Sequence, residues 1–182
     1  FLHYYNVMDE YKSKLLRKLK IECSESNDEL SHVEHLYNNF VSLFVVSVED
    51  YCIDNSIDNP LDKLKEEKKE DEDKPDSLGS GLMNVFRSIV RKSHPDKVGD
   101  SDVDSYVEAT EAKKSKDASK LISVSKDLRV DLNELTFSDI REIELSIKKT
   151  NEKIDKIRSS YPWVWYFATD SQKKVIISRF VD

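Results

Sequence analysis

The sequence predicts an all-α protein, and three observations support this fold class. The 182 residues include only 3 glycines and 4 prolines, too few of the turn-forming residues that a sheet of many strands needs. In several segments, apolar residues recur at steps of three and four, which is the spacing of one face of an α-helix. Near the C-terminal end, isoleucines recur every seven residues, a pattern typical of long helices that pack on another helix.

Composition and charge argue against several classes of function. The formal net charge of -7 disfavours a general nucleic-acid-binding protein, because phosphate contacts need clustered Lys and Arg. The longest apolar run, residues 40–48, is much shorter than the ~20 residues that span a bilayer. Cys23 and Cys52 are the only cysteines, and neither has metal-ligand spacing. We therefore expect reduced thiols in a cytoplasmic protein that binds no nucleic acid, membrane, metal or cofactor.

Residues 1–53 are expected to form an N-terminal helical segment. Apolar spacing predicts one amphipathic helix over residues 4–22 and a second helix that ends at about Tyr51. The polar residues 24–28 between them predict a break in the helix, with Asp28 as the N-cap of the second helix.

Residues 54–76 are expected to form a charged linker. Within it, residues 65–74 include no apolar side chain, which is typical of a solvated segment. Pro75 and the Gly79-Ser80-Gly81 triplet mark its end, since proline and glycine both interrupt regular elements. A new unit should begin near Ser77.

Residues 77–132 are expected to form that unit, which begins with a short amphipathic helix. The basic side chains on its outer face are Arg87, Arg91 and Lys92. Pro95 disfavours helical backbone at His94 and should end the helix there. Residues 94–100 are then left as an exposed connection.

Two further helices complete this unit. The first is predicted over residues 102–115, where Ser101 and Asp104 have the spacing of a capping box. Its small alanines allow close approach of the preceding helix, so we expect the two helices to form an antiparallel hairpin. The second is predicted over residues 118–128, with Asp117 as its N-cap.

Residues 133–182 are expected to form a long helix with an aromatic and helical end. Its heptad positions are Ile140, Ile147, Ile154 and Tyr161, together with Ile143, Thr150 and Ile157. These heptads predict coiled-coil-like packing on another helix. The partner is either the N-terminal helical segment, in an antiparallel pair, or a second copy of the chain in a homodimer. Trp163 and Trp165 alternate, so one ring is expected to face inward and the other outward.

The stretch Leu82–Leu128 resembles J-domain proteins, which are co-chaperones of Hsp70. Three features carry the resemblance in order: a basic amphipathic helix, the exposed tripeptide His94-Pro95-Asp96 followed by Lys97, and a helix with small residues. Within this family the chain is similar to the compact J-like proteins that large DNA viruses and phages encode. That similarity rests on the basic helix, residues 106–112, the end of the short helix at residues 128–130, and the long helix that leads to a Trp-containing end.

The chain departs from the common J-domain pattern in two places. Nothing clearly matches the short helix with an aromatic residue and a Leu-Gly turn that precedes the basic helix, although Ser77-Leu78-Gly79 stands where such a turn would end. Lys113 stands where the family usually has an aromatic residue. Both departures bear on the strength of Hsp70 stimulation rather than on the identity of the loop.

The resemblance implies that the HPD loop (His94-Pro95-Asp96) and the basic helix dock on the nucleotide-binding domain of Hsp70 and its linker. This docking promotes ATP hydrolysis by Hsp70, while the J-protein itself catalyses nothing. Asp96 would pair with an Hsp70 arginine, Pro95 would hold the turn, and His94 would order the loop or contact the partner. The electrostatic docking surface would consist of Arg87, Arg91, Lys92 and Lys97. Its attraction should weaken with salt.

Simpler interpretations of the same residues stay open. The basic residues of the helix are also typical of an ordinary solvated face. His94 has no Cys, His or carboxylate pair at ligand spacing nearby, which disfavours a metal site or a general base. Trp163 and Trp165 are expected to close the end of the helix pair, with recruitment of a client or capsid partner as the alternative. The chain has no phosphate loop, nucleophile elbow or catalytic carboxylate pair, so we expect no enzymatic activity.

The alternative to a co-chaperone is a structural or assembly protein that retains a J-like fold, such as a minor component of a virion or capsid. The long helices would then provide the assembly contacts. The two functions differ in what must be exposed, because a co-chaperone needs a free basic helix and a free HPD loop.

Overall fold

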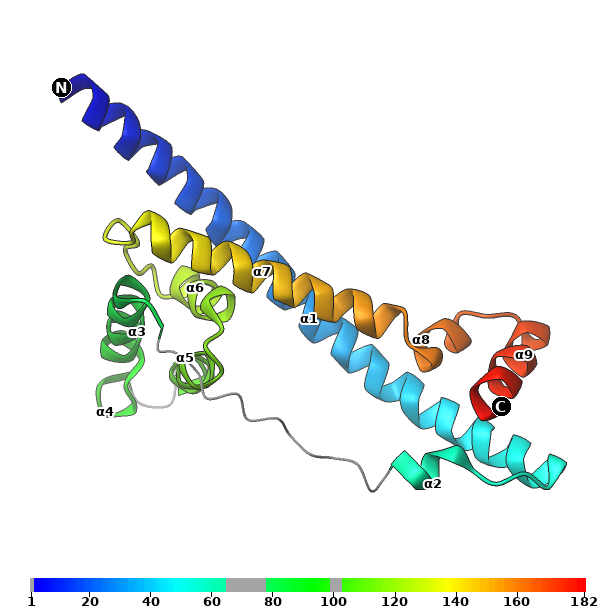
Figure 1. The fold of residues 1–182 in the computed structure, drawn as a ribbon. Coiled ribbons are helices and arrows are strands. Elements are labelled where there is room, and N and C mark those ends of the chain that lie inside the picture. Colours follow the sequence, from blue (N-terminus) through cyan, green and yellow to red (C-terminus); the bar gives the residue numbers. More distant parts are fainter. Residues whose placement is uncertain (1, 65–77, 99–102) are drawn as a thin grey trace. The chain divides into compact units, whose positions relative to one another are not determined.

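A computed structural model describes residues 2–64, 78–98 and 103–182 of the chain. Every regular element in these ranges is an α-helix, and no strand occurs among them (Figure 1). The predicted all-α class is therefore confirmed.

The chain forms two compact units that are interleaved along the sequence. Unit 1 consists of residues 1–29 and 75–151, and unit 2 consists of residues 30–74 and 152–182. Helices α1 and α7 contribute residues to both units. The predicted division into four successive segments stays a prediction, and much of the charged linker, residues 65–76, lies outside the described residues.

Helix α1 (Leu2–Asn55) is one helix of 54 residues, so the predicted break at residues 24–28 and the N-cap at Asp28 are wrong. This stretch is polar, but it has neither the glycine nor the proline that interrupts a helix on steric grounds. Instead, the Asn27 amide donates to the Cys23 carbonyl at 2.7 Å and to the Ser119 hydroxyl at 2.9 Å. The polar residues make a contact between helices.

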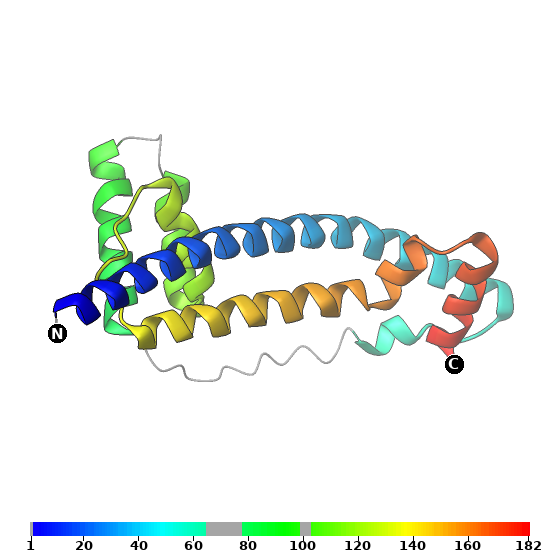
Figure 2. The ribbon, with the colours of Figure 1, turned by 90° about the horizontal axis from the view of Figure 1, so that it is seen from above.

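Unit 1 is built around helices α3 (Ser80–Ser93), α5 (Val103–Ser115) and α6 (Ala118–Asp127), which pack against one another. The α1 and α7 (Phe137–Arg158) residues of this unit lie beside each other in both ribbon views (Figures 1 and 2). One apolar core joins these helices; its buried members include Leu16, Leu19, Leu82, Ile89, Ala109, Ala112, Leu121, Ile122, Ile140 and Ile143. The two fully buried alanines bring α5 close to its neighbours.

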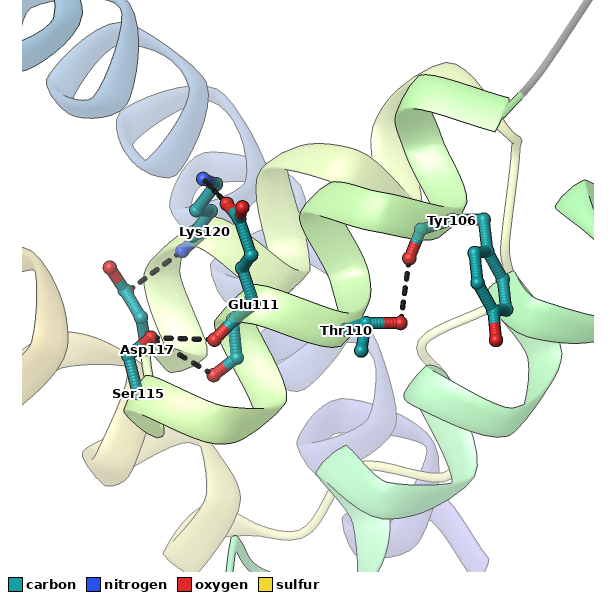
Figure 3. Close-up of polar contacts among 7 residues, drawn as sticks. Tyr106, Thr110, Glu111, Ser115, Asp117 and Lys120 are labelled. Carbon is teal, nitrogen blue, oxygen red and sulfur yellow. Dashed lines mark hydrogen bonds and ion pairs between the residues drawn. The ribbon is translucent and has the colours of Figure 1, made fainter.

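The turn between α5 and α6 contains one residue with left-handed backbone and the N-cap of α6. Lys116 has a φ of 55°, and the following N–H, from Asp117, donates to the Ala112 carbonyl at 2.8 Å, as in a Schellman motif. The Asp117 carboxylate then accepts from the Lys120 N–H at 2.9 Å (Figure 3). This contact confirms the predicted N-cap of α6. The Lys120 ammonium also pairs with the Glu111 carboxylate at 3.2 Å and so joins α6 to α5 (Figure 3).

A polar network extends from this cap to α7 and α1. The Ser146 hydroxyl on α7 donates to the Asp117 carboxylate at 2.8 Å and accepts from the Ser119 N–H at 3.0 Å. Ser119, which is fully buried, accepts from Asn27 on α1 through its own hydroxyl. Because buried polar groups need partners, this network favours one alignment of the three helices.

The seven-residue pattern identifies the buried side of α7. The side chains of Ile140, Ile143, Ile147, Thr150 and Ile154 are buried. The last predicted position differs, since Tyr161 is 46% exposed and begins the next helix, α8 (Tyr161–Tyr166).

Unit 2 comprises the remainder of α1, α2 (Pro60–Leu64), the end of α7, α8 and α9 (Asp170–Val181). Its buried core consists of Phe44, Val48, Cys52, Trp165 and Ile177. The predicted inward tryptophan is Trp165, which is only 8% exposed. Trp163 does not point fully outward, because it is half-buried and its ring centroid lies 5.3 Å from that of Phe40.

Candidate functional site

Helix α3 presents the predicted basic face to solvent. Its apolar side is buried through Leu82, Val85 and Ile89, and Arg87 and Arg91 are exposed. The helix ends at Ser93 and His94 has extended backbone, with a φ of -64° and a ψ of 129°. This is the conformation that the ring of a following proline imposes, so the predicted helix end is confirmed.

Within the HPD loop, the histidine contacts the backbone of the aspartate. Pro95 begins α4 (Pro95–Val98), a single turn of helix. His94 Nδ1 accepts a hydrogen bond from the Asp96 N–H at 3.3 Å and lies 3.6 Å from Asp96 Oδ2. The side chain of His94 is 40% exposed and that of Asp96 is 86% exposed. The loop therefore holds the aspartate backbone while its carboxylate faces solvent.

Tyr106 on α5 supports the other side of the histidine. The Tyr106 and His94 rings meet edge to face, with centroids 5.6 Å apart, a favourable aromatic geometry. The sequence did not predict this pairing, which depends on the packing of α5 beside the loop.

The predicted basic residues have different surroundings. The Arg87 guanidinium donates to the Asn84 side chain at 3.0 Å. The Lys92 ammonium donates to the carbonyls of Leu128 and Arg129, at 2.8 and 3.1 Å, and so satisfies carbonyls at the C-terminal end of α6. Lys92 consequently stabilises the fold in addition to any role in docking. The side chain of Lys97 lies outside the described residues.

Lys113 on α5 contacts an aromatic ring. Its ammonium lies 4.8 Å from the centroid of the Phe86 ring on α3, within the range of a cation–π interaction. This contact joins α3 to α5 near the basic face. The sequence did not predict this contact, because the lysine and the phenylalanine lie on separate helices.

The opposite end of α3 is held by carboxylates from α7. Asp139 is only 4% exposed, and it forms a capping box with Thr136 in which its carboxylate accepts from the Thr136 N–H at 2.8 Å. A β-carbon at Gly79 would lie 2.5 Å from Asp139 Oδ1, and the Gly79 N–H donates to the Glu142 carboxylate at 3.3 Å. Two acidic side chains therefore face the positive end of the α3 dipole.

No protein-family model, curated protein or solved structure matches this chain. In the part of the chain that the structure describes, no group of three or more His, Cys, Asp or Glu residues is placed to hold a metal ion. No described helix combines the length and the apolar character that a membrane span requires.

Proposed function

We propose that this chain is a J-domain co-chaperone, which binds an Hsp70 chaperone through the HPD loop and the basic face of α3 and stimulates its ATPase. In this proposal α3 and α5 form the J-like hairpin, and α1 and α7 form a coiled-coil-like scaffold that carries it. The chain itself catalyses no reaction.

The observation that carries the proposal is the placement of Asp96. Its carboxylate is 86% exposed, while its N–H is bonded to His94, whose ring rests on Tyr106. A charged group on a backbone that is already ordered loses less conformational entropy when it binds. A carboxylate presented in this way suits a charge-assisted hydrogen bond with an arginine of Hsp70.

The basic face provides a second, electrostatic contribution. Arg87 and Arg91 are exposed on the helix that leads into the loop, in a chain whose net charge is -7. A local positive patch of this kind accelerates encounter with an acidic surface and loses its effect as salt is added. Binding to Hsp70 should therefore be sensitive to salt.

An assembly role is the second candidate function, and exposed apolar residues on α1 favour it. Leu43, Val46 and Ile53 are 52%, 55% and 75% exposed. In an assembly protein such residues would be covered by neighbouring subunits, and the HPD unit would be retained only as a fold.

Equilibrium binding to several ATP-loaded Hsp70 chaperones distinguishes the two functions. We expect the wild-type chain to bind at least one of them, and Asp96→Asn to bind at least about tenfold more weakly, since it removes a charged hydrogen-bond partner. Asp104→Asn is the matched control, because Asp104 is also an exposed carboxylate and should have no effect. Equal binding by the two variants, or no binding to any Hsp70 tested, would count against the co-chaperone.

A further inference from the structure

Unit 2 has an open, largely apolar groove between α8 and α9 that the proposed Hsp70-binding residues, all in unit 1, do not use. Its volume is about 670 Å³, within the range of about 300 to 1,000 Å³ that is typical of ligand sites. The residues that line it include Trp163, Val164, Phe167, Val175, Ile176 and Arg179.

The aromatic wall of the groove is fixed by contacts between rings. Phe167 is 65% exposed, yet its ring centroid lies 5.5 Å from that of Phe40, 5.6 Å from that of Trp163 and 5.2 Å from that of Tyr166. Phe40 also stacks on Tyr166 at 3.8 Å. A large apolar side chain is therefore held toward solvent, in an arrangement that already suits binding.

The charge of the groove indicates that its occupant carries an acidic group. Among the residues that line it, Arg179 is the one charged side chain, and no carboxylate is present. The amide oxygen of Gln172, another lining residue, accepts from Thr169 and is committed to the cap of α9. An occupant should therefore combine apolar groups with a carboxylate that reaches the Arg179 guanidinium.

We infer that this groove binds a short apolar peptide segment of a protein partner, with an acidic side chain opposite Arg179. The groove is open to solvent, whereas sites for small molecules enclose most of the ligand. An apolar face laid across such a groove is a common mode of peptide recognition, with a few side chains as anchors. This inference does not depend on the proposed Hsp70 interaction.

The test is selection of a displayed random-peptide library on the wild-type chain, followed by affinity measurements on variants. We expect enriched peptides to combine apolar anchors with Asp or Glu. They should bind at least about tenfold more weakly to Val175→Asp, which places a charge in the apolar wall. Arg179→Glu should weaken binding, and replacement of the acidic peptide residue by Lys should restore it. Ile57→Asp is the matched control, because Ile57 is an exposed apolar residue of unit 2 outside the groove.

Three results would overturn the inference. One is that no peptide is enriched, and another is that the enriched peptides bind Val175→Asp or Arg179→Glu as well as they bind the wild type. The third is self-association of the wild-type chain in sedimentation velocity that Val175→Asp abolishes, since the occupant would then be a second copy. Circular dichroism of each variant verifies the helical fold, and the exposure of Val175 and Arg179 favours its retention.

Discussion

The carboxylate of Asp139 lies so close to the backbone of Gly81 that a β-carbon at Gly81 would clash with Oδ2, and would lie 2.8 Å from Cγ and 3.1 Å from Oδ1. Asp139 is buried, on α7, and Gly81 lies in the first turn of α3. The glycine is therefore required for close approach of the two helices, and not only for a boundary between segments.

We predict that Gly81→Ala lowers the free energy of unfolding by about 2 kcal/mol, in the range of overpacked sites. At an ordinary helical position the same change would stabilise the protein by roughly 0.5–1 kcal/mol. A loss of stability would therefore indicate the close contact with Asp139. Urea unfolding followed by circular dichroism measures it. Adding Asp139→Ala removes the clashing group, so Gly81→Ala should cost less in that background; an equal cost in both backgrounds would disprove the contact.

Ser146→Ala should also destabilise the fold, by about 1–3 kcal/mol. The change leaves the buried N–H of Ser119 without its acceptor, and the N-cap carboxylate of Asp117 keeps the Lys120 N–H but loses its other donor. Urea unfolding provides the comparison. Ser42→Ala, which removes an exposed hydroxyl bonded within α1, serves as the control and should change stability much less. Similar losses in both variants would contradict the network.

Substitutions of the two neighbouring basic residues of α3 should have different effects on stability and on Hsp70 binding. Lys92→Ala removes two hydrogen bonds to carbonyls and should lower the free energy of unfolding by about 1 kcal/mol. Arg91→Ala should leave unfolding unchanged and weaken Hsp70 binding at low salt. Paired unfolding and binding measurements test this. An unchanged unfolding curve for Lys92→Ala would show that its contacts contribute little.

Stability should fall at high pH because of Cys23. Burial raises the pKa of the Cys23 thiol to about 12, from an ordinary value of 9.0. Above the lower value the unfolded thiol loses its proton while the folded thiol keeps it, so rising pH favours the unfolded state by up to about 1.4 kcal/mol per pH unit. The stability advantage of the wild type over Cys23→Ala should therefore shrink between about pH 9 and 11. A constant difference over this range would contradict burial of the thiol.

Local sequence signals predicted α6 and the end of α3 well. The N-cap at Asp117 and the ring of Pro95 act on adjacent residues, so their effects do not depend on the rest of the fold. The end of α1 was harder to predict, because Ser56, which follows it, is a non-glycine residue in the left-handed region, with a φ of 54°. The usual glycine signal is absent there.

Contacts between distant segments account for most of what the sequence did not predict. The polar residues of α1 suggested a helix end because their partner Ser119 is distant in the sequence. The sequence did not indicate that Asp139 is buried, because the residues of α3 that lie against it are distant in the sequence. In the candidate site, the HPD loop and the basic residues were identified from the sequence, whereas the support of His94 by Tyr106 depended on tertiary packing.

The most direct test of the co-chaperone function is single-turnover ATP hydrolysis by Hsp70, with the wild-type chain and with Asp96→Asn, at low and at physiological salt. We predict stimulation by the wild type that is stronger at low salt, and its loss in Asp96→Asn. Stimulation that survives this substitution, or its absence with every Hsp70 tested, would contradict the function and favour an assembly role.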